Sequence, residues 1–176
     1  MCMRDHIIIG GAASAVLYVF TGPAALWFFS ASVLIDLDHY LDFVFHNRAR
    51  DLSIKRMFDY HSTLQRWWRD PAFLNMEIFH TAEFLIIFLS LAIILQSRIM
   101  ALVFGGFIFH IILDMIFLLR HNIFNKRTNS LTSYFIRKNR MARMGHDPAV
   151  LYSRAVEIVS PHRHSKRSTH ILEDKR

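Results

Sequence analysis

Six histidine and aspartate residues of this sequence stand inside, or at the ends of, otherwise apolar stretches. They are Asp36, Asp38, His39, His80, His110 and Asp114. A polar or charged group among apolar residues is expensive to desolvate, whereas one shared cation compensates several carboxylates and neutral imidazoles together. Imidazole and carboxylate ligands suit Zn²⁺, Mn²⁺ or Fe²⁺. We therefore predict that these residues hold one or two divalent metal ions.

The spacing of these residues places them on common helical faces. His110 and Asp114 are four residues apart within an apolar block, and residues at this spacing are neighbours on a helix. Glu77 and Glu83 each lie three residues from His80. Because an acidic group beside a metal ion can also take up a proton, Glu83 is a candidate ligand or catalytic general base.

Each group also has an interpretation without metal. Segment 36–39 could be a helix C-terminus that reaches the membrane interface, although carboxylates are unfavourable there. His80 could lie in the first turn of a helix, and His110 with a protonated Asp114 could be a packing contact between helices. The metal interpretation is favoured because separate apolar segments each contribute ionisable groups.

The apolar stretches predict an all-α integral membrane protein, a helical bundle. Residues 7–35 contain no Asp, Glu, Lys, Arg or His, and a run of 18 or more such residues is typical of a membrane span. Two further apolar blocks, 72–95 and 99–119, predict two longer membrane helices. A signal peptide is the alternative for the N-terminus, but the apolar sequence continues beyond Pro23, farther than a signal peptide needs.

Residues 7–35 could form one long span or a hairpin of two short helices. The sequence Thr21-Gly22-Pro23 favours a turn, and thus the hairpin. The hairpin would place His6 about 22 Å from the turn, at the depth of the other candidates, and would make it an additional ligand. A single span would leave His6 on the opposite side of the membrane. Each hairpin helix has only about 14 residues, fewer than the roughly 20 of a full crossing.

In a membrane protein, basic residues such as those behind the net charge of +7 first indicate which side of the membrane each loop occupies. The sequence has no nucleic-acid-binding motif, so we expect no nucleic acid partner. In the hairpin arrangement every Lys and Arg except Arg98 falls on one side, which is the cytoplasmic side by the positive-inside rule. We predict a multi-pass protein of the inner (plasma) membrane with a cytoplasmic C-terminus. The single cysteine excludes an internal disulfide and a cysteine-based zinc site.

Two regions are predicted along the chain. Residues 1–120 form the membrane-embedded metal-site domain, in which the aromatic segment 40–71 is an interfacial cytoplasmic cap and His61 an extra candidate ligand. Residues 121–176 form a basic cytoplasmic tail that contacts anionic lipid and is partly disordered at 160–176.

Four sequence elements within residues 1–120 resemble the YdjM-type membrane-bound metal-dependent hydrolases, an inner-membrane family. They are an early His before a Gly/Ala-rich stretch (His6, then Gly10-Gly11-Ala12-Ala13), an Asp-x-Asp-His motif (36–39), a His that opens a later helix (His80), and a Gly-x-x-x-His-x-x-x-Asp motif (Gly106 to Asp114). The chain departs from the family pattern at Ile35, where the family has Pro, and at Phe79-His80-Thr81, where it has Thr-His-Ser.

The resemblance implies a hydrolase that attacks an ester or phosphodiester through a metal-activated water. A more distant similarity to zinc-dependent phospholipase C implies a lipid-like substrate, such as a lipid head group, and membrane lipid as a partner. The alternative is a non-catalytic membrane protein. It would use intramembrane His, Asp and Glu for ion or proton passage or for haem binding.

Overall fold

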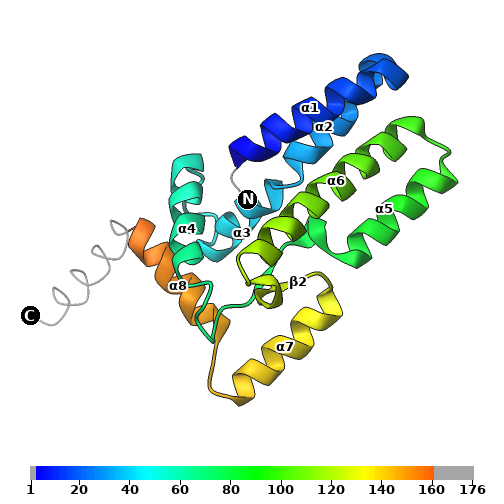
Figure 1. Ribbon diagram of the computed structural model, residues 1–176. Coiled ribbons are helices and arrows are strands. Elements are labelled where there is room, and N and C mark those ends of the chain that lie inside the picture. The colour runs from blue at the N-terminus through cyan, green and yellow to red at the C-terminus, as the bar shows by residue number, and fades with distance from the viewer. Residues whose placement is uncertain (1–2, 161–176) are drawn as a thin grey trace, which may run out of the picture. The chain divides into compact units, whose positions relative to one another are not determined.

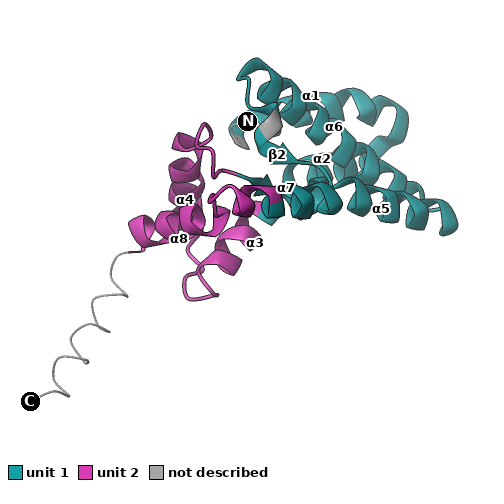
Figure 2. Cartoon of the chain, turned by 90° about the horizontal axis from the view of Figure 1, so that it is seen from below, with its two compact units in different colours: residues 1–38, 74–139 teal, residues 39–73, 140–176 magenta. Residues whose placement is uncertain are grey.

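The protein, described by a computed structural model over residues 3–160, is mostly helical, as predicted (Figure 1). Its elements in chain order are α1 (Met3–Thr21), η1 (Gly22–Ala24), α2 (Ala25–Leu34), α3 (Leu37–His46), α4 (Ile54–Arg66), β1 (Asn75–Met76), η2 (Ile78–His80), α5 (Ala82–Ile94), α6 (Arg98–Arg120), η3 (Phe124–Lys126), β2 (Arg127–Thr128), α7 (Leu131–Arg143) and α8 (Pro148–Val159). The chain divides into two compact units (Figure 2). The first takes residues up to 38 and 74–139, and the second takes 39–73 and the residues from 140 onward.

The apolar run 7–35 has the hairpin arrangement. α1 ends at Thr21, and Gly22 has a φ of +58°, a backbone conformation that glycine adopts without strain. Pro23 then lies in η1, and α2 returns alongside α1 (Figure 1). The Ser14 hydroxyl of α1 donates a 3.0 Å hydrogen bond to the Ala25 carbonyl of α2, which connects the two helices near the turn. The hairpin therefore brings the start of α1 back to the end of α2.

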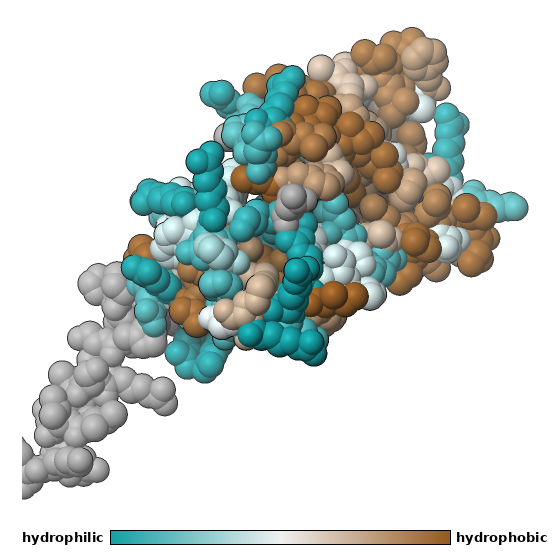
Figure 3. Space-filling view, turned by 60° about the horizontal axis from the view of Figure 1, so that its bottom comes forward, coloured by the Kyte–Doolittle hydropathy of each residue, from teal (hydrophilic) through white to brown (hydrophobic). Residues whose placement is uncertain are grey.

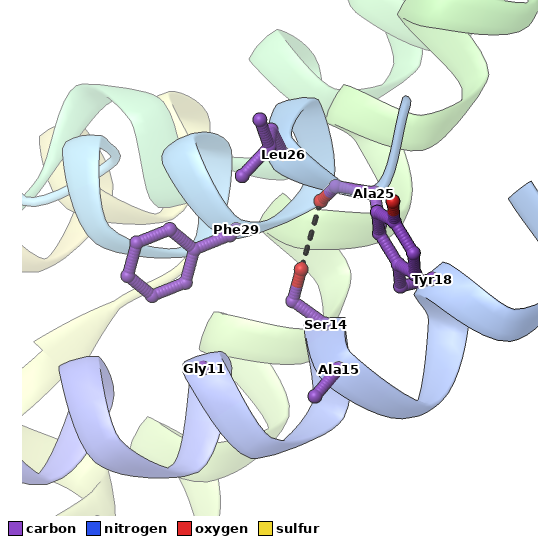
Figure 4. A pocket seen from close by; sticks show the side chains of 7 residues that line it. All are labelled: Gly11, Ser14, Ala15, Tyr18, Ala25, Leu26 and Phe29. Carbon is purple, nitrogen blue, oxygen red and sulfur yellow. Dashed lines mark hydrogen bonds between the residues drawn. The ribbon is translucent and has the colours of Figure 1, made fainter. Parts of the chain in front are cut away.

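An apolar groove of about 380 Å³ follows the contact between α1 and α2 (Figure 4). It is lined by Gly11, Ser14, Ala15, Tyr18, Ala25, Leu26 and Phe29. These residues include no histidine and no acidic side chain, so the groove is separate from the candidate metal ligands.

α2 and α6 pack closely because Gly106 presents no side chain to α2. A Cβ atom at this position would overlap the Phe28 carbonyl oxygen and would lie 2.9 Å from the Ala31 Cβ. Small residues allow helices to approach at such short range. The close approach places the end of α2, with Ser32, directly against the α6 face that carries His110.

The apolar block 72–95 is helical over a shorter range than predicted. α5 begins only at Ala82, where the Thr81 side chain caps it by accepting the Phe84 N–H. The preceding residues instead form β1 and η2, so His80 lies in a turn before the helix rather than on it. By contrast, the block 99–119 forms one helix, α6, as predicted.

A short parallel pairing of β1 and β2 was not predicted. Asn75 pairs with Arg127, and Met76 pairs with Thr128. The Thr128 hydroxyl also donates a 2.9 Å hydrogen bond to the Asn75 carbonyl. This pairing fixes the segment after α6 within the first unit, beside η2.

Two helical runs are long and apolar enough to cross a membrane: Arg4–His46, which includes the hairpin turn, and Arg98–Arg120. Only 11% and 17% of their apolar portions are buried, whereas the core helix of a water-soluble protein is mostly buried. α5 is a third apolar helix but has only 13 residues. Large exposed apolar side chains cover these helices (Figure 3) and include Ile8, Val16, Phe20, Leu26, Ile86, Ile94 and Ile112. Such an extensive apolar surface is typical of contact with a membrane or a partner.

The second unit is a helical cluster with its own core. α3, α4 and α8 contribute buried side chains that include Phe43, Met57, Tyr60, Leu64, Tyr152 and Ala155. Part of the region predicted as a tail is therefore folded against the segment predicted as a cap. The apolar positions 151, 152 and 155 of α8 share one helical face, which the basic composition of the region concealed. We also predicted disorder for residues 160–176. The positions from 161 onward lie outside the described residues.

Candidate metal centre

The first unit gathers ionisable side chains from four separate segments. They are His6 of α1, Asp36 and Asp38 at the junction of α2 and α3, His80 of η2, and His110 and Asp114 of α6. Four of them, Asp36, His80, His110 and Asp114, each offer one ligand atom, and these four atoms all lie within 4.8 Å of one another. Three of the four residues are buried. This group could hold a metal ion.

His110 presents its Nε2 atom to two carboxylates. Its Nδ1 lies 2.7 Å from the Ser32 carbonyl oxygen, which can only accept, so we assign the proton to Nδ1. In the neutral ring Nε2 carries a lone pair. This atom lies 3.2 Å from Asp36 Oδ1 and 3.5 Å from Asp114 Oδ2, without a hydrogen bond to any described residue. A buried lone pair facing carboxylate oxygens is repulsive. A cation among these atoms would make all three contacts attractive.

His80 repeats this arrangement with a carboxylate behind the ring. Its Nδ1 donates to Asp38 Oδ2 at 2.9 Å, and the Phe79 N–H donates to the same oxygen at 3.3 Å. The Nε2 atom points the other way, 4.0 Å from Asp114 Oδ2, and is buried without a hydrogen-bond partner among residues 3–160. A carboxylate behind a histidine fixes the ring and increases its basicity as a metal ligand. Asp38, predicted as a ligand, is therefore placed to orient His80.

His6 packs directly against the centre. Its ring stacks on the His110 ring with centroids 3.9 Å apart and an angle of 11° between the planes. Its Nε2 donates to Asp114 Oδ1 at 3.1 Å. The hairpin turn allows both contacts, because it places the start of α1 beside the part of α6 that carries His110 and Asp114. His6 thus holds Asp114 in position, and its predicted role as a ligand stays a prediction.

Arg127 is the site residue that sequence reasoning missed. Its Nη1 donates to Asp114 Oδ2 at 2.8 Å, and its Nη2 forms an ion pair with Glu77. Burial alone would lower the pKa of Arg127, but Glu77 and Asp114 raise it above its ordinary value, so the guanidinium stays charged. No sequence signal distinguishes Arg127, since it lies among many basic residues of the predicted tail.

Two predicted site residues have other partners. Glu83 accepts hydrogen bonds from the Ser130 hydroxyl at 2.7 Å and the Leu131 N–H at 3.1 Å, at the start of α7. The hydrogen bond from Ser130 lowers the pKa of Glu83, which makes it a weaker base. His39 belongs to the second unit, where its carbonyl accepts a 2.7 Å hydrogen bond from His61 and its ring lies 4.7 Å from the His61 ring. The proposed roles of Glu83 and His39 stay predictions.

Asp38→Asn will reduce the affinity of the centre for a divalent ion by about 10–100-fold, the usual effect of removing a carboxylate behind a metal-binding histidine. The neutral amide holds the His80 ring less firmly and does not increase its basicity. Titration calorimetry of the purified protein with Zn²⁺ or Mn²⁺ measures this change. The matched control is Asp59→Asn, at an exposed position of α4, which should leave the affinity unaltered. Equal affinities of Asp38→Asn and the wild type would mean that Asp38 does not support metal binding by His80.

The first unit is thus a helical scaffold that collects histidines and carboxylates in its interior. Comparison of the chain with protein-family models, with curated proteins and with solved structures finds no match.

Proposed function

We propose that this protein is a membrane-bound metal-dependent hydrolase that holds a divalent ion among Asp36, His80, His110 and Asp114. One observation carries the proposal: the Nε2 atoms of two buried imidazoles face carboxylate oxygens with which they form no hydrogen bond. A doubly protonated His110, paired with Asp36 and Asp114, is the alternative without metal, and the metal content of the purified protein distinguishes the two. The mixed nitrogen and oxygen donors suit Zn²⁺, Mn²⁺ or Fe²⁺.

The chain positions three of the four proposed ligands through neighbouring groups. Ser32 holds the His110 ring, Asp38 holds the His80 ring, and Arg127 holds the Asp114 carboxylate. Asp36 is the most accessible of the four, with a side chain 13% exposed, so we place the approach of substrate on its side. A bound divalent ion supplies Lewis acidity and a water whose pKa is lowered toward neutrality, which suits hydrolysis of an ester or phosphodiester.

The apolar surface supports a multi-pass location in the inner (plasma) membrane, with the C-terminus cytoplasmic by the positive-inside rule. On α7, Phe135 and Ile136 are 57% and 63% exposed, beside Lys138 and Arg140. Exposed apolar and basic side chains on one helix suit the interface of an anionic membrane. We therefore propose a lipid head group as the substrate class and anionic lipid as a contact of the basic C-terminal region. The resemblance to YdjM-type hydrolases agrees with this proposal.

Metal content and hydrolysis, measured together on wild-type protein and His110→Ala, test the proposal. The wild type in detergent, after dialysis against Zn²⁺, Mn²⁺ or Fe²⁺, should retain metal. It should also hydrolyse members of a panel of ester and phosphodiester lipids, and a chelator should abolish both properties. His110→Ala should lose metal and activity while keeping its helical circular dichroism spectrum. A folded wild type that binds none of the three ions would overturn the proposal.

One observation favours a second function, proton passage. The ionisable side chains of His6, Asp114, His110 and Asp36 lie one after another at 3.1, 3.5 and 3.2 Å, and the first of these contacts is a hydrogen bond. Linked ionisable groups within a membrane are typical of proton pathways. Proton flux into liposomes that requires Asp114, in protein without bound metal, would favour this function over hydrolysis.

A further inference from the structure

Arg127 is a buried cation at the edge of the candidate metal centre. Its side chain is 8% exposed, and its guanidinium joins the Asp114 and Glu77 carboxylates through different nitrogen atoms. Both carboxylates also face His80: Asp114 Oδ2 lies 4.0 Å from Nε2, and Glu77 Oε2 lies 3.5 Å from Nδ1. The guanidinium therefore lies where two acidic groups of the centre come together.

The position of Arg127 is fixed by its backbone. Arg127 pairs with Asn75 in the β1–β2 ladder, and its carbonyl accepts a 3.3 Å hydrogen bond from Arg137 Nη1. The neighbouring Thr128 hydroxyl is bonded to the Asn75 carbonyl. A guanidinium also matches two carboxylates through several N–H donors at once. The chain therefore holds this cation in place.

The carboxylates of the centre carry more negative charge than one divalent ion neutralises. Four carboxylates, from Asp36, Asp38, Glu77 and Asp114, would be neutralised by two divalent ions if the histidines are neutral. With the guanidinium present, one divalent ion leaves a single negative charge. In two-metal sites the ions lie only about 3.5–4 Å apart, and acidic groups hold both of them. A second ion at the edge of the centre beside Arg127 would need Asp114 and Glu77, and these two carboxylates are already joined by the guanidinium.

We propose that Arg127 takes the place of a second metal ion and limits the centre to one divalent ion per chain. This inference rests on the proposed metal-binding function. It makes Arg127 a positioning residue, which holds Asp114 and neutralises Glu77.

The number of bound ions in four proteins tests this inference. Wild type, Arg127→Gln, Arg127→Lys and the double variant Arg127→Gln/Glu77→Gln are purified at full length in detergent. Each is dialysed against saturating Mn²⁺ and assayed for metal per chain. We expect one ion in the wild type and in Arg127→Lys, which keeps the charge. Arg127→Gln should bind two, because Asp114 and Glu77 become available, and the double variant should return to one, because Glu77 no longer supplies a charge.

The outcomes separate this inference from the proposed function. A wild type with two ions overturns the inference and leaves the metal-dependent function standing, whereas a folded wild type with none overturns the function. A folded Arg127→Gln variant that binds a single ion also overturns the inference. If Arg127→Gln does not fold, electron paramagnetic resonance of the Mn²⁺-saturated wild type decides. The six-line spectrum of an isolated ion is expected, and a spin-coupled spectrum would contradict the inference.

Discussion

Asp114→Asn will bind a divalent ion at least about 100-fold more weakly than the wild type. Losing a group that only supports a ligand reduces metal affinity by up to about 100-fold, and the loss of a ligand should cost at least as much. Asp114 has the most contacts in the centre: Oδ1 accepts from His6, and Oδ2 faces His110, His80 and Arg127. The amide keeps the shape of the side chain but removes its negative charge. The cation then loses a charged ligand and stays close to the guanidinium.

The measurement is thermal unfolding in detergent with and without added Zn²⁺ or Mn²⁺. An ion at 100 times its Kd stabilises a folded protein by about 2.7 kcal/mol, and the variant should lose most of this gain at the same concentration. The matched control is Asp42→Asn in the second unit, where Asp42 also pairs with a histidine four residues later, His46, at 3.0 Å. This control should keep the stabilisation by metal. Equal stabilisation of Asp114→Asn and the wild type would exclude Asp114 as a ligand.

Gly106→Ala will lower the free energy of unfolding by about 1–3 kcal/mol or more, the range for adding a methyl group to a tightly packed contact. The new Cβ would overlap the Phe28 carbonyl oxygen, and the backbone of α2 offers no flexible side chain that could move aside. α2 must therefore shift away from α6. Because Ser32 holds His110 and Asp36 follows α2, the same shift should weaken metal binding.

Gly105→Ala is the control for this effect, because it makes the same change one residue earlier on the same helix. Its Cβ would meet only the Phe28 ring, at 3.6 Å, an ordinary van der Waals contact. Stability should stay the same or rise by up to about 1 kcal/mol, since alanine favours a helix over glycine. Thermal unfolding and metal titration of both variants check the pair. Similar losses at the two positions would mean that the α2–α6 contact does not position the centre.

Local features of the sequence determined the helices and the candidate ligands. The apolar block 99–119 is long enough to specify α6, and Gly22-Pro23 specified the turn that brings His6 back toward α6. Imidazoles and carboxylates in apolar surroundings identified four residues that the structure gathers within 4.8 Å. The sequence could indicate the turn and these residues because desolvation cost and turn chemistry depend on residue type and near neighbours.

Tertiary packing decided which group faces which. Glu77 and Glu83 are equally spaced around His80 in the sequence, but the turn before α5 separates their environments. Glu77 pairs with Arg127, and Glu83 accepts from Ser130. Likewise, Asp38 orients a histidine 42 residues away. The sequence by itself indicated that the acidic groups and imidazoles either bind a common cation or pair with one another. Only the fold decided that one of the available cations is Arg127, because partners so distant along the chain are selected by backbone pairing and helix contacts.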